Sequence, residues 1–184
     1  MTRSRSDGYK VQRTEREWQY VLSPAQYYIL RNGGTERPFS SILESEKREG
    51  TFACAACGEP LFKSEAKFNS GTGWPSFATM LPGGEVEDVN PVQMGLLGAE
   101  LRCGTCGGHL GDVFLDGKVF VNTPAFLSGK RHCIDGGALV FKPADGSEDV
   151  FGDLPPPSKT PAKGSSQQLP DIFTPPKITP RERG

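Results

Sequence analysis

Beyond Gly50, apolar residues occur in short runs that are separated by Gly, Pro or Asn. Runs of this length, bounded by turn-forming residues, are typical of β-strands. Asp116-Gly117 lies between two of the runs and predicts a tight hairpin turn. The pattern predicts strands at residues 51–53, 60–62, 96–102, 113–115, 118–121 and 138–141.

A helix is indicated earlier in the chain. Ser23-Pro24-Ala25-Gln26 places Ser at the N-cap, Pro at the first helical position and Gln at the third. This is a capping box with a pre-set φ angle. The apolar and aromatic residues 27–30 follow, and Asn32-Gly33-Gly34 ends the helix. We therefore expect one or two short helices followed by antiparallel sheets.

Composition agrees with a turn-rich, mainly β chain, because 23 Gly and 16 Pro occur among 184 residues. Nine of the prolines lie in residues 143–184, where apolar residues are few, so this stretch is expected to be disordered or a Pro-rich docking segment. Residues 1–17 are polar and expected to be loose. The predicted division is a polar N-terminal segment over 1–19, a globular domain over 20–143 and a tail over 144–184.

The charge balance argues against some partners. Lys plus Arg is 21 and Asp plus Glu is 22, which gives no electrostatic case for nucleic acid or an anionic membrane. No apolar run approaches the roughly 20 residues that span a bilayer, and the N-terminus has no apolar secretory core. Its Arg and Ser content leaves an organelle transit peptide open, although nearby acidic residues argue against one. We expect a cytoplasmic protein.

Four of the five cysteines form two matched pairs, Cys54-Ala-Ala-Cys57-Gly58 and Cys103-Gly-Thr-Cys106-Gly107. A two-residue spacer lets both sulfurs of a pair reach one ion at about 2.3 Å, and the following Gly permits the tight turn. Four thiolates close the coordination shell, so we expect one structural Zn²⁺ per chain that joins two distant hairpins. Two redox dithiols, or two buried pairs without metal, are the alternatives.

Cys133 is the cysteine that remains. Lys130, Arg131 and His132 precede it directly, and nearby cations favour the reactive thiolate. A buried, inert thiol is an equally weighted interpretation.

Two further residues are candidates for a site. Trp74 follows a run of small residues and is either a core residue or an aromatic wall for an apolar or sulfur-bearing ligand. His109 is either structural or a proton donor near a thiolate.

The motifs in combination resemble the methionine-R-sulfoxide reductase (MsrB) family over residues 22–143. The resemblance rests on Arg-Pro-Phe-Ser at 37–40, the first cysteine pair, Pro-Leu-Phe at 60–62, Ser-Gly-Thr-Gly-Trp-Pro-Ser-Phe at 70–77, Arg-Cys-Gly-Thr-Cys-Gly-Gly-His-Leu-Gly at 102–111 and Arg-His-Cys at 131–133. It implies two antiparallel β-sheets with small helices, a four-cysteine zinc site, and reduction of methionine-R-sulfoxide in peptides or proteins.

The resemblance also implies roles. Cys133 would attack the sulfoxide sulfur and become a sulfenic acid. Trp74 would pack the methyl group of the substrate, with Thr72 and Phe77 as further substrate contacts. Arg131 would hold the thiolate and the proton-donating network in place, and His109 matches the first histidine of the family pattern His-Leu-Gly-His.

This chain departs from the family pattern at several positions. Asp112 replaces the second histidine, Asp135 replaces a common Asn, and the segment 116–130 is longer than usual. The two aspartates could share a proton and provide the acid, or His109 or His132 could do so. Thr72 occupies the position of a resolving cysteine, so the reductant would be an external thiol such as thioredoxin, or glutathione with glutaredoxin.

Two other functions compete with the enzyme. One is a catalytically impaired module of the same fold that binds peptides or partners, as the two aspartates suggest. The other is a zinc-ribbon adaptor, against which the near-neutral charge argues where nucleic acid is the partner.

Overall fold

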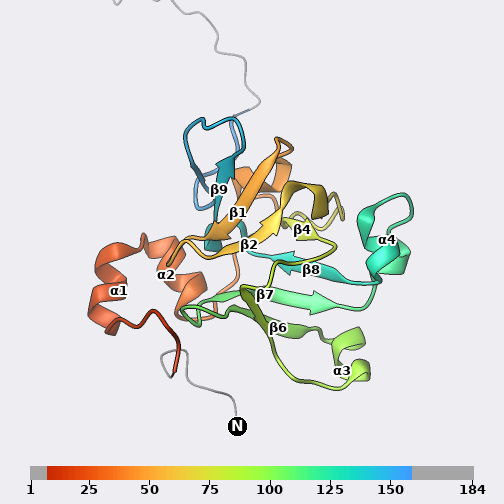
Figure 1. Cartoon of the computed structure of the whole chain (residues 1–184), viewed down its shortest axis with the longest axis horizontal. Coiled ribbons are helices and arrows are strands. Elements are labelled where there is room, and N and C mark those ends of the chain that lie inside the picture. Colours follow the sequence, from red (N-terminus) through yellow and green to blue (C-terminus); the bar gives the residue numbers. More distant parts are fainter. Residues whose placement is uncertain (1–7, 159–184) are drawn as a thin grey trace, which may run out of the picture.

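The computed structural model describes residues 8–158 and shows two antiparallel β-sheets bordered by short helices (Figure 1). The first sheet has the strand order β10-β9-β1-β2, and the second has the order β3-β4-β8-β7-β6-β5. This confirms the mainly β fold. The strands are β1 Gly50–Cys54, β2 Pro60–Lys63, β3 Lys67–Phe68, β4 Ser76–Phe77, β5 Gly84–Val86, β6 Ala99–Cys103, β7 His109–Phe114, β8 Arg131–Ile134, β9 Leu139–Pro143 and β10 Val150–Phe151.

The described helices are all short. The α-helices are α1 Glu15–Val21, α2 Pro24–Leu30, α3 Pro91–Leu96 and α4 Pro124–Ser128, and the 3₁₀ helices are η1 Ile42–Ser45, η2 Ser64–Ala66, η3 Gly117–Val119 and η4 Gly136–Ala138. The predicted helix is α2, and its capping box is present: Gln26 N donates to Ser23 Oγ at 3.2 Å, and Ser23 N donates to Gln26 Oε1 at 2.9 Å.

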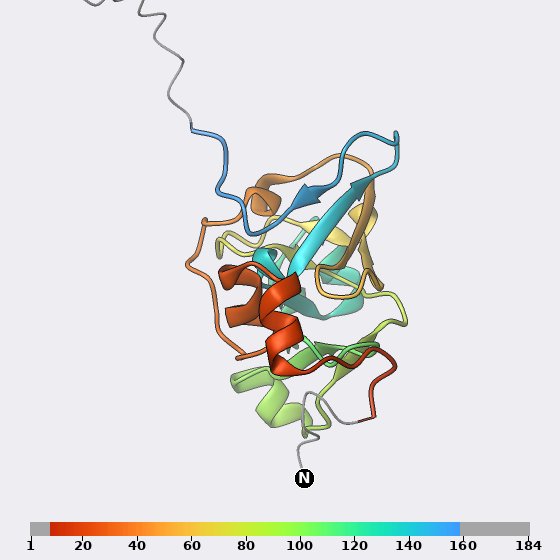
Figure 2. The same ribbon diagram turned by 90° about the vertical axis from the view of Figure 1, so that its left-hand side faces the viewer.

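The N-terminal region differs from its prediction. Residues 8–17 were expected to be loose, but α1 begins within them and has its own capping box of Thr14 and Glu17. Trp18 is 1% exposed and Tyr9 is 4% exposed. The two helices α1 and α2 lie side by side at one edge of the molecule (Figures 1 and 2). Two buried aromatic side chains anchor this polar stretch, and composition averages conceal them.

The predicted strand at 118–121 is wrong, and so is the hairpin turn at Asp116-Gly117. The chain enters η3 and then α4 before it returns as β8, which pairs with β7. Val119 and Val121 are exposed, whereas Phe120 packs against Phe68. An apolar run forms a strand only where a neighbouring strand accepts its hydrogen bonds, and β8 already takes that edge of β7.

The C-terminal tail was predicted from residue 144, but residues 144–158 contain β10, which pairs with β9. Asp153 also accepts a hydrogen bond from Ser23 at the start of α2, with an Oγ–Oδ2 distance of 2.7 Å. Residues 1–7 and 159–184, which include most of the predicted tail, lie outside the described residues.

Aromatic side chains join the two sheets in the core. Phe77 of β4 stacks on Phe62 of β2 with ring centroids 4.2 Å apart, and meets Phe52 of β1 edge-on at 5.0 Å. Phe52 also contacts Phe141 of β9 at 4.7 Å. All four rings are fully buried. This cluster fixes the second sheet, which carries Cys133 on β8, against the first.

Candidate active site and metal centre

The two cysteine pairs lie on matched turns at the ends of β1 and β6. In the first turn, Gly58 N donates to Cys54 O at 2.8 Å, and in the second, Gly107 N donates to Cys103 O at 2.8 Å. Gly58 and Gly107 have φ angles of 80° and 72°. Only glycine adopts this left-handed backbone without cost, as the sequence predicted for the residue after each pair. The two turns belong to different sheets, so the cysteines join them.

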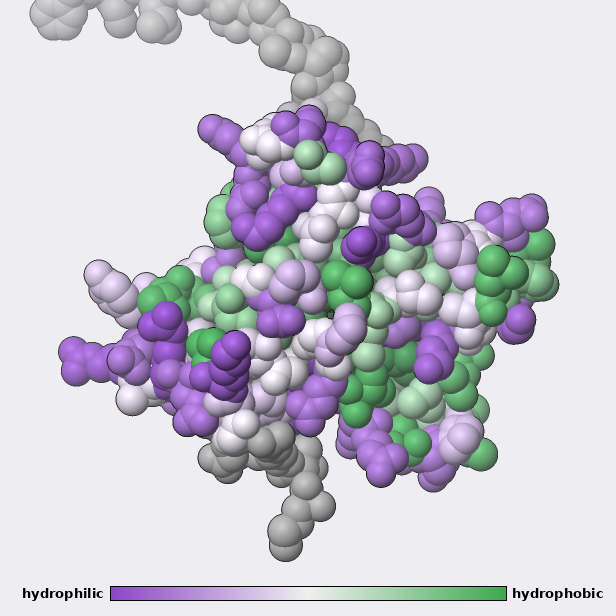
Figure 3. All heavy atoms as spheres, in the orientation of Figure 1, coloured by the Kyte–Doolittle hydropathy of each residue, from purple (hydrophilic) through white to green (hydrophobic). Residues whose placement is uncertain are grey.

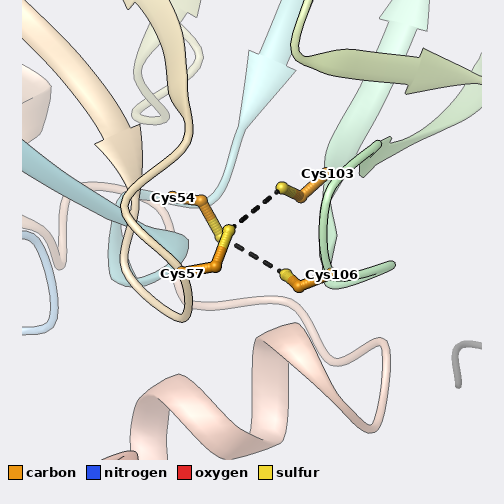
Figure 4. Close-up of side chains that lie close together, drawn as sticks. All are labelled: Cys54, Cys57, Cys103 and Cys106. Atoms are coloured by element: carbon orange, nitrogen blue, oxygen red, sulfur yellow. Dashed lines mark hydrogen bonds between the residues drawn. The ribbon is translucent and has the colours of Figure 1, made fainter. Parts of the chain in front are cut away.

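The four sulfurs form one compact cluster, in which all lie within 4.8 Å of one another (Figure 4). The Sγ atoms of Cys54 and Cys106 are 3.7 Å apart, and those of Cys57 and Cys103 are 3.5 Å apart. A tetrahedron with metal–sulfur bonds of about 2.3 Å has edges of roughly 3.8 Å. The cluster therefore has the size and the ligand chemistry of a four-thiolate metal site.

Cys133 lies apart from this cluster, in the middle of β8. Its cross-strand neighbours are Ser76 on β4 and Asp112 on β7. Gly111 precedes Asp112, and a Cβ atom there would collide with the carbonyl oxygen of Cys133. A glycine is therefore required where β7 passes the backbone of Cys133. The close approach places the Asp112 carboxyl beside the Cys133 thiol.

A cavity of about 160 Å³ opens at Cys133. Four residues that the sequence singled out come together in its lining: Trp74, Asp112, Cys133 and Asp135. Sequence reasoning missed the three other lining residues, Thr35, Gly111 and Phe114. An indole, a phenyl ring, a thiol and two carboxyl groups thus face one small space.

The electrostatics of Cys133 agree with the buried thiol, one of the two interpretations that the sequence left open. Burial raises the pKa of its thiol to about 11; Arg131 opposes this shift, while the carboxylates of Asp135 and Asp112 support it. The sequence suggested that adjacent cations would favour a thiolate. Instead, desolvation outweighs them, and the carboxylates of Asp135, two residues further along the chain, and of Asp112, on the neighbouring strand, cancel part of their effect.

Arg131 lies two residues before Cys133 on β8, so both side chains point to the same face of the sheet. Its guanidinium group binds Asp116 through two nitrogens, with distances of 3.1 Å from Nε to Oδ1 and 2.9 Å from NH2 to Oδ2. The same group lies 4.5 Å from the ring centroid of Phe114. Arg131 is therefore held rigidly beside the cavity by partners other than Cys133.

Three carboxyl groups near Cys133 bind protons more tightly than usual. Burial raises the pKa of Asp135 to about 6 and that of Glu36 to about 7, and it also raises the pKa of Asp112. Asp135 Oδ1 accepts a hydrogen bond from Glu36 N at 2.9 Å. The Glu36 carboxylate in turn accepts from Gly136 N and Gly137 N at 2.6 and 2.8 Å. Glu36 thus holds the backbone that follows Asp135.

His109 begins β7 and faces the same group of carboxyls. Its Nδ1 lies 2.8 Å from Glu100 Oε1, and its Nε2 lies 3.8 Å from Asp135 Oδ2. The sequence gave no signal for Glu100, because its partner is nine residues away across the β6–β7 hairpin. His109 is mostly buried, with a side chain 9% exposed.

Comparison with known proteins places this arrangement in a family. The model of the SelR domain matches residues 22–143. The chain belongs to the SelR domain family.

Its similar relatives carry the name peptide methionine sulfoxide reductase MsrB. The Agrobacterium fabrum protein is 43% identical over 134 residues, which cover 73% of this chain and 94% of the relative. The Methanosarcina barkeri protein is 46% identical over 132 residues, which cover 72% and 88%. The Pseudomonas savastanoi pv. phaseolicola protein is 45% identical over 134 residues, which cover 73% and 97%.

Within this SelR domain, Trp74 and Thr72 lie on the loop that leads into β4. Trp74 Nε1 donates to Glu36 O at 3.1 Å, which fixes the indole at the cavity. The Thr72 hydroxyl lowers the pKa of the Cys133 thiol, against the larger effect of burial, and it hydrogen bonds with Ser70 Oγ at 2.8 Å. The loop thus supplies both an aromatic wall and a hydroxyl group to Cys133.

Two candidates do not join the other site residues. Phe77 is fully buried in the aromatic core and does not line the cavity. His132 alternates to the opposite face of β8, where its Nδ1 lies 2.9 Å from Phe77 O. Strand alternation, which places residues 131 and 133 together, turns residue 132 away.

Exposed apolar side chains gather on the side of the SelR domain that carries α3 and α4 (Figure 3). Both segments approach the residues around the cavity: a Cβ atom at Gly98, which follows α3, would contact Phe114 and Asp112, and the Phe120 ring centroid lies 5.8 Å from Arg131 Cζ. The apolar rim is the set Val92, Leu96, Leu97, Val119, Val121, Phe126 and Leu127, whose side chains are 40 to 84% exposed.

Proposed function

We propose that this protein reduces the R epimer of methionine sulfoxide in peptides, with Cys133 as the nucleophile. One observation carries the proposal: a single thiol, separate from the four-sulfur cluster, faces a small cavity lined by Trp74, Phe114 and two carboxyl groups. Membership of the SelR domain family, with relatives named peptide methionine sulfoxide reductase, supports it.

The reaction balances with Cys133 alone as reductant. The sulfur of Cys133 attacks the sulfoxide sulfur, the S–O bond of the substrate breaks, and the oxygen ends on Cys133 as a sulfenic acid. Methionine sulfur gains two electrons and Cys133 loses two. The proton of the resting thiol is sufficient for the sulfenic acid, so no proton is consumed overall.

That proton must nevertheless move from sulfur to oxygen, which is acid–base work. Asp135 has a pKa of about 6 because of burial, and it shares the cavity with Asp112. A carboxyl group that titrates near neutral pH can accept the thiol proton and deliver it to the sulfoxide oxygen. We assign this transfer to Asp135, whose pKa is raised by neighbouring Asp112 and lowered by His109.

The remaining cavity residues bind and orient the substrate. Trp74 and Phe114 offer aromatic faces to the S-methyl group, a contact that sulfur-bearing groups favour. The Thr72 hydroxyl stabilises the Cys133 thiolate as it forms, and the fixed Arg131 guanidinium adds positive charge nearby. Phe77 contributes from the core by holding β4 in place.

The four-cysteine cluster fits Zn²⁺, and we propose one structural zinc per chain held by Cys54, Cys57, Cys103 and Cys106. Bound zinc would join the two sheets and supply no open coordination position for substrate.

The oxidised enzyme needs an external reductant. The chain has five cysteines and four belong to the cluster, so no further thiol remains to resolve the Cys133 sulfenic acid. A dithiol protein such as thioredoxin is the reductant we propose, with two thiols converted to a disulfide and water released. A reducing compartment such as the cytoplasm suits five unpaired cysteines. Among residues 8–158, no helix is long and apolar enough to cross a membrane.

The apolar rim supports a peptide or protein substrate. Its exposed side chains lie on the α3 and α4 segments, which approach Phe114 and Arg131 beside the cavity, so residues neighbouring an oxidised methionine would contact them. Free methionine sulfoxide would leave this surface unused.

A non-catalytic peptide-binding module is the competing function, and the protonated state of Cys133 favours it. Reduction of the separated R and S epimers of a peptide methionine sulfoxide, driven by dithiothreitol, decides between them. We expect turnover of the R epimer only, and none for Cys133→Ser. Absence of turnover in the metal-loaded, folded wild-type protein would leave the binding module.

A further inference from the structure

The SelR match begins at residue 22, yet the structure packs the preceding residues tightly against the domain. We call residues 8–21 the N-terminal arm. Val11 N donates to Thr105 O at 2.9 Å, inside the second cysteine turn. The guanidinium group of Arg31 lies over Trp18, with 4.7 Å between Arg31 Cζ and the centroid of the indole ring. Arg31 also donates a hydrogen bond to Cys106 O at 3.1 Å. The arm is therefore part of the ordered structure around β6.

Tyr9 is a residue of the arm whose contacts lead toward the site. Its side chain is almost fully buried, and its hydroxyl accepts a hydrogen bond from Arg102 and donates one to Glu85. Glu85 and Arg102 are directly opposite each other on β5 and β6. A hydroxyl between a cation and a carboxylate satisfies both groups and limits the movement of Arg102.

Arg102 continues the connection along one face of β6. Its NH2 donates to Glu100 Oε2 at 2.9 Å, and the other carboxylate oxygen of Glu100 lies 2.8 Å from His109 Nδ1. A carboxylate can only accept, so Nδ1 of a neutral His109 must carry the proton. Nε2 is then the unprotonated nitrogen, and it faces Asp135 at the cavity.

We propose that Tyr9 is a positioning residue for the active site: through Arg102 and Glu100 it fixes the orientation and the tautomer of His109. The hydrogen bond that one ring nitrogen of a histidine makes decides which nitrogen carries the proton, whether or not the ring binds a metal. This proposal rests on the proposed function in one respect: its predicted effect on turnover requires the reductase activity. Its prediction for the tautomer of His109 does not.

The test uses the full, metal-loaded chain with ¹⁵N-labelled histidine. Only two histidines are present, so both imidazole rings can be assigned by NMR. Tyr9→Phe removes the hydroxyl and keeps the ring, and Tyr20→Phe is the matched control because Tyr20 is 90% exposed. Arg102→Lys, which keeps the charge but loses the planar fork, is the second variant.

At a pH where the His109 ring carries a single proton, we expect the wild-type spectrum to show that proton on Nδ1. Tyr9→Phe and Arg102→Lys shift this population toward the Nε2–H tautomer, whereas the His132 signals and the Tyr20→Phe spectrum stay as in wild type. In the reductase assay, kcat falls roughly fivefold in Tyr9→Phe, equivalent to one net hydrogen bond, with KM unchanged.

Unchanged ¹⁵N shifts of His109 in both variants would overturn the proposal, even if turnover fell, because Tyr9 would then be only structural. The two proposals fail separately. A wild-type protein without reductase activity whose His109 tautomer still depends on Tyr9 refutes the proposed function and keeps the positioning role. An active wild type with an insensitive His109 does the reverse.

Discussion

Cysteine serves two different regions of this molecule, and the contrast shows what decides the fate of a thiol. In the metal centre, two copies of one local turn bring four sulfurs within 4.8 Å of one another. At the cavity, a single sulfur lies on β8 between strands β4 and β7. The first arrangement repeats a short motif, whereas the second is assembled from segments far apart in the chain.

The two regions also differ in their neighbours. The cluster sulfurs face one another, and the backbone turn after each pair is held by a glycine of positive φ. Cys133 instead faces two carboxyl groups, a hydroxyl and aromatic rings. Thiols that face thiols need a cation to compensate their charge, whereas a thiol beside buried carboxylates stays protonated until a substrate is bound.

Removing one sulfur from each region should give the largest contrast. We expect Cys103→Ser to lose the metal and to unfold at ordinary temperature, because a structural zinc supplies on the order of 10 kcal/mol of folding free energy. Cys133→Ser should keep its metal and its melting temperature to within a few degrees, since a hydroxyl replaces a half-buried thiol. Metal analysis and thermal unfolding of both variants, with wild type treated with a chelator, provide the measurement. A Cys103→Ser protein that stays folded without metal would contradict the structural role.

This contrast explains how much the sequence could predict. The four-cysteine cluster was predictable, because the spacing of each pair and the following Gly are local features of the sequence. The helix α2 was predictable for the same reason, through Ser23 and Gln26. At the cavity, Cys133 and Trp74 were singled out from their local context, whereas Asp112 and Asp135 were identified only through the resemblance.

What the sequence did not predict depends on tertiary contacts. Glu36 and Glu100 meet Asp135 and His109 only through the fold, and a glutamate in a polar stretch has no signal of its own. The sequence left the ionisation of Cys133 open for the same reason, since adjacent cations are visible in the sequence and burial is not. Residues 118–121 did not form the predicted strand because β7 pairs with β8 instead, and the sequence does not show which segment pairs with β7.

Alkylation sharpens the contrast between the two kinds of thiol. In the metal-loaded chain, we expect iodoacetamide to modify Cys133 and to leave the cluster cysteines unmodified. Because the pKa of Cys133 is about 11, its rate should rise about tenfold per pH unit between about pH 8 and 10, whereas an ordinary thiol levels off near about 8.5. Peptide mapping by mass spectrometry gives the rate at each site.

Two variants serve as controls for this measurement. Asp135→Asn removes a negative charge and should raise the rate at pH 8, and Arg131→Gln should lower it. A rate that levels off below about pH 9 would mean that Cys133 is less desolvated than its environment indicates.

Exchange of the aspartates tests which carboxyl group moves the proton. We expect Asp135→Asn to lower kcat for the R-sulfoxide about 30-fold, within the range of general acid–base catalysis, and to remove a titration near pH 6 from the pH–rate profile. Asp112→Asn should lower the pKa of that titration, because one neighbouring negative charge is gone, and reduce kcat less. Metal content should be unchanged in both. An unaltered acidic limb in Asp135→Asn would move the assignment to Asp112 or His109.

The smallest expected effect concerns Glu36, which holds the backbone after Asp135 and has no counterpart in the metal centre. Burial raises its pKa to about 7 from an ordinary value of 4.5, so the folded state binds this proton more tightly than the unfolded state. The unfolding free energy contributed by this group is therefore fully present below about pH 4.5 and is lost as pH rises toward about 7, by about 1–2 kcal/mol after allowance for solvent screening. Glu36→Gln should flatten this slope, while exposed Glu148→Gln should preserve it. Urea unfolding at several pH values between about 5.5 and 8, where the metal stays bound, measures the difference. The contrary result is an unfolding free energy that rises with pH in this window and has the same pH dependence in Glu36→Gln. It would show that the Gly136 and Gly137 amides stabilise the charged carboxylate of Glu36 more than burial destabilises it.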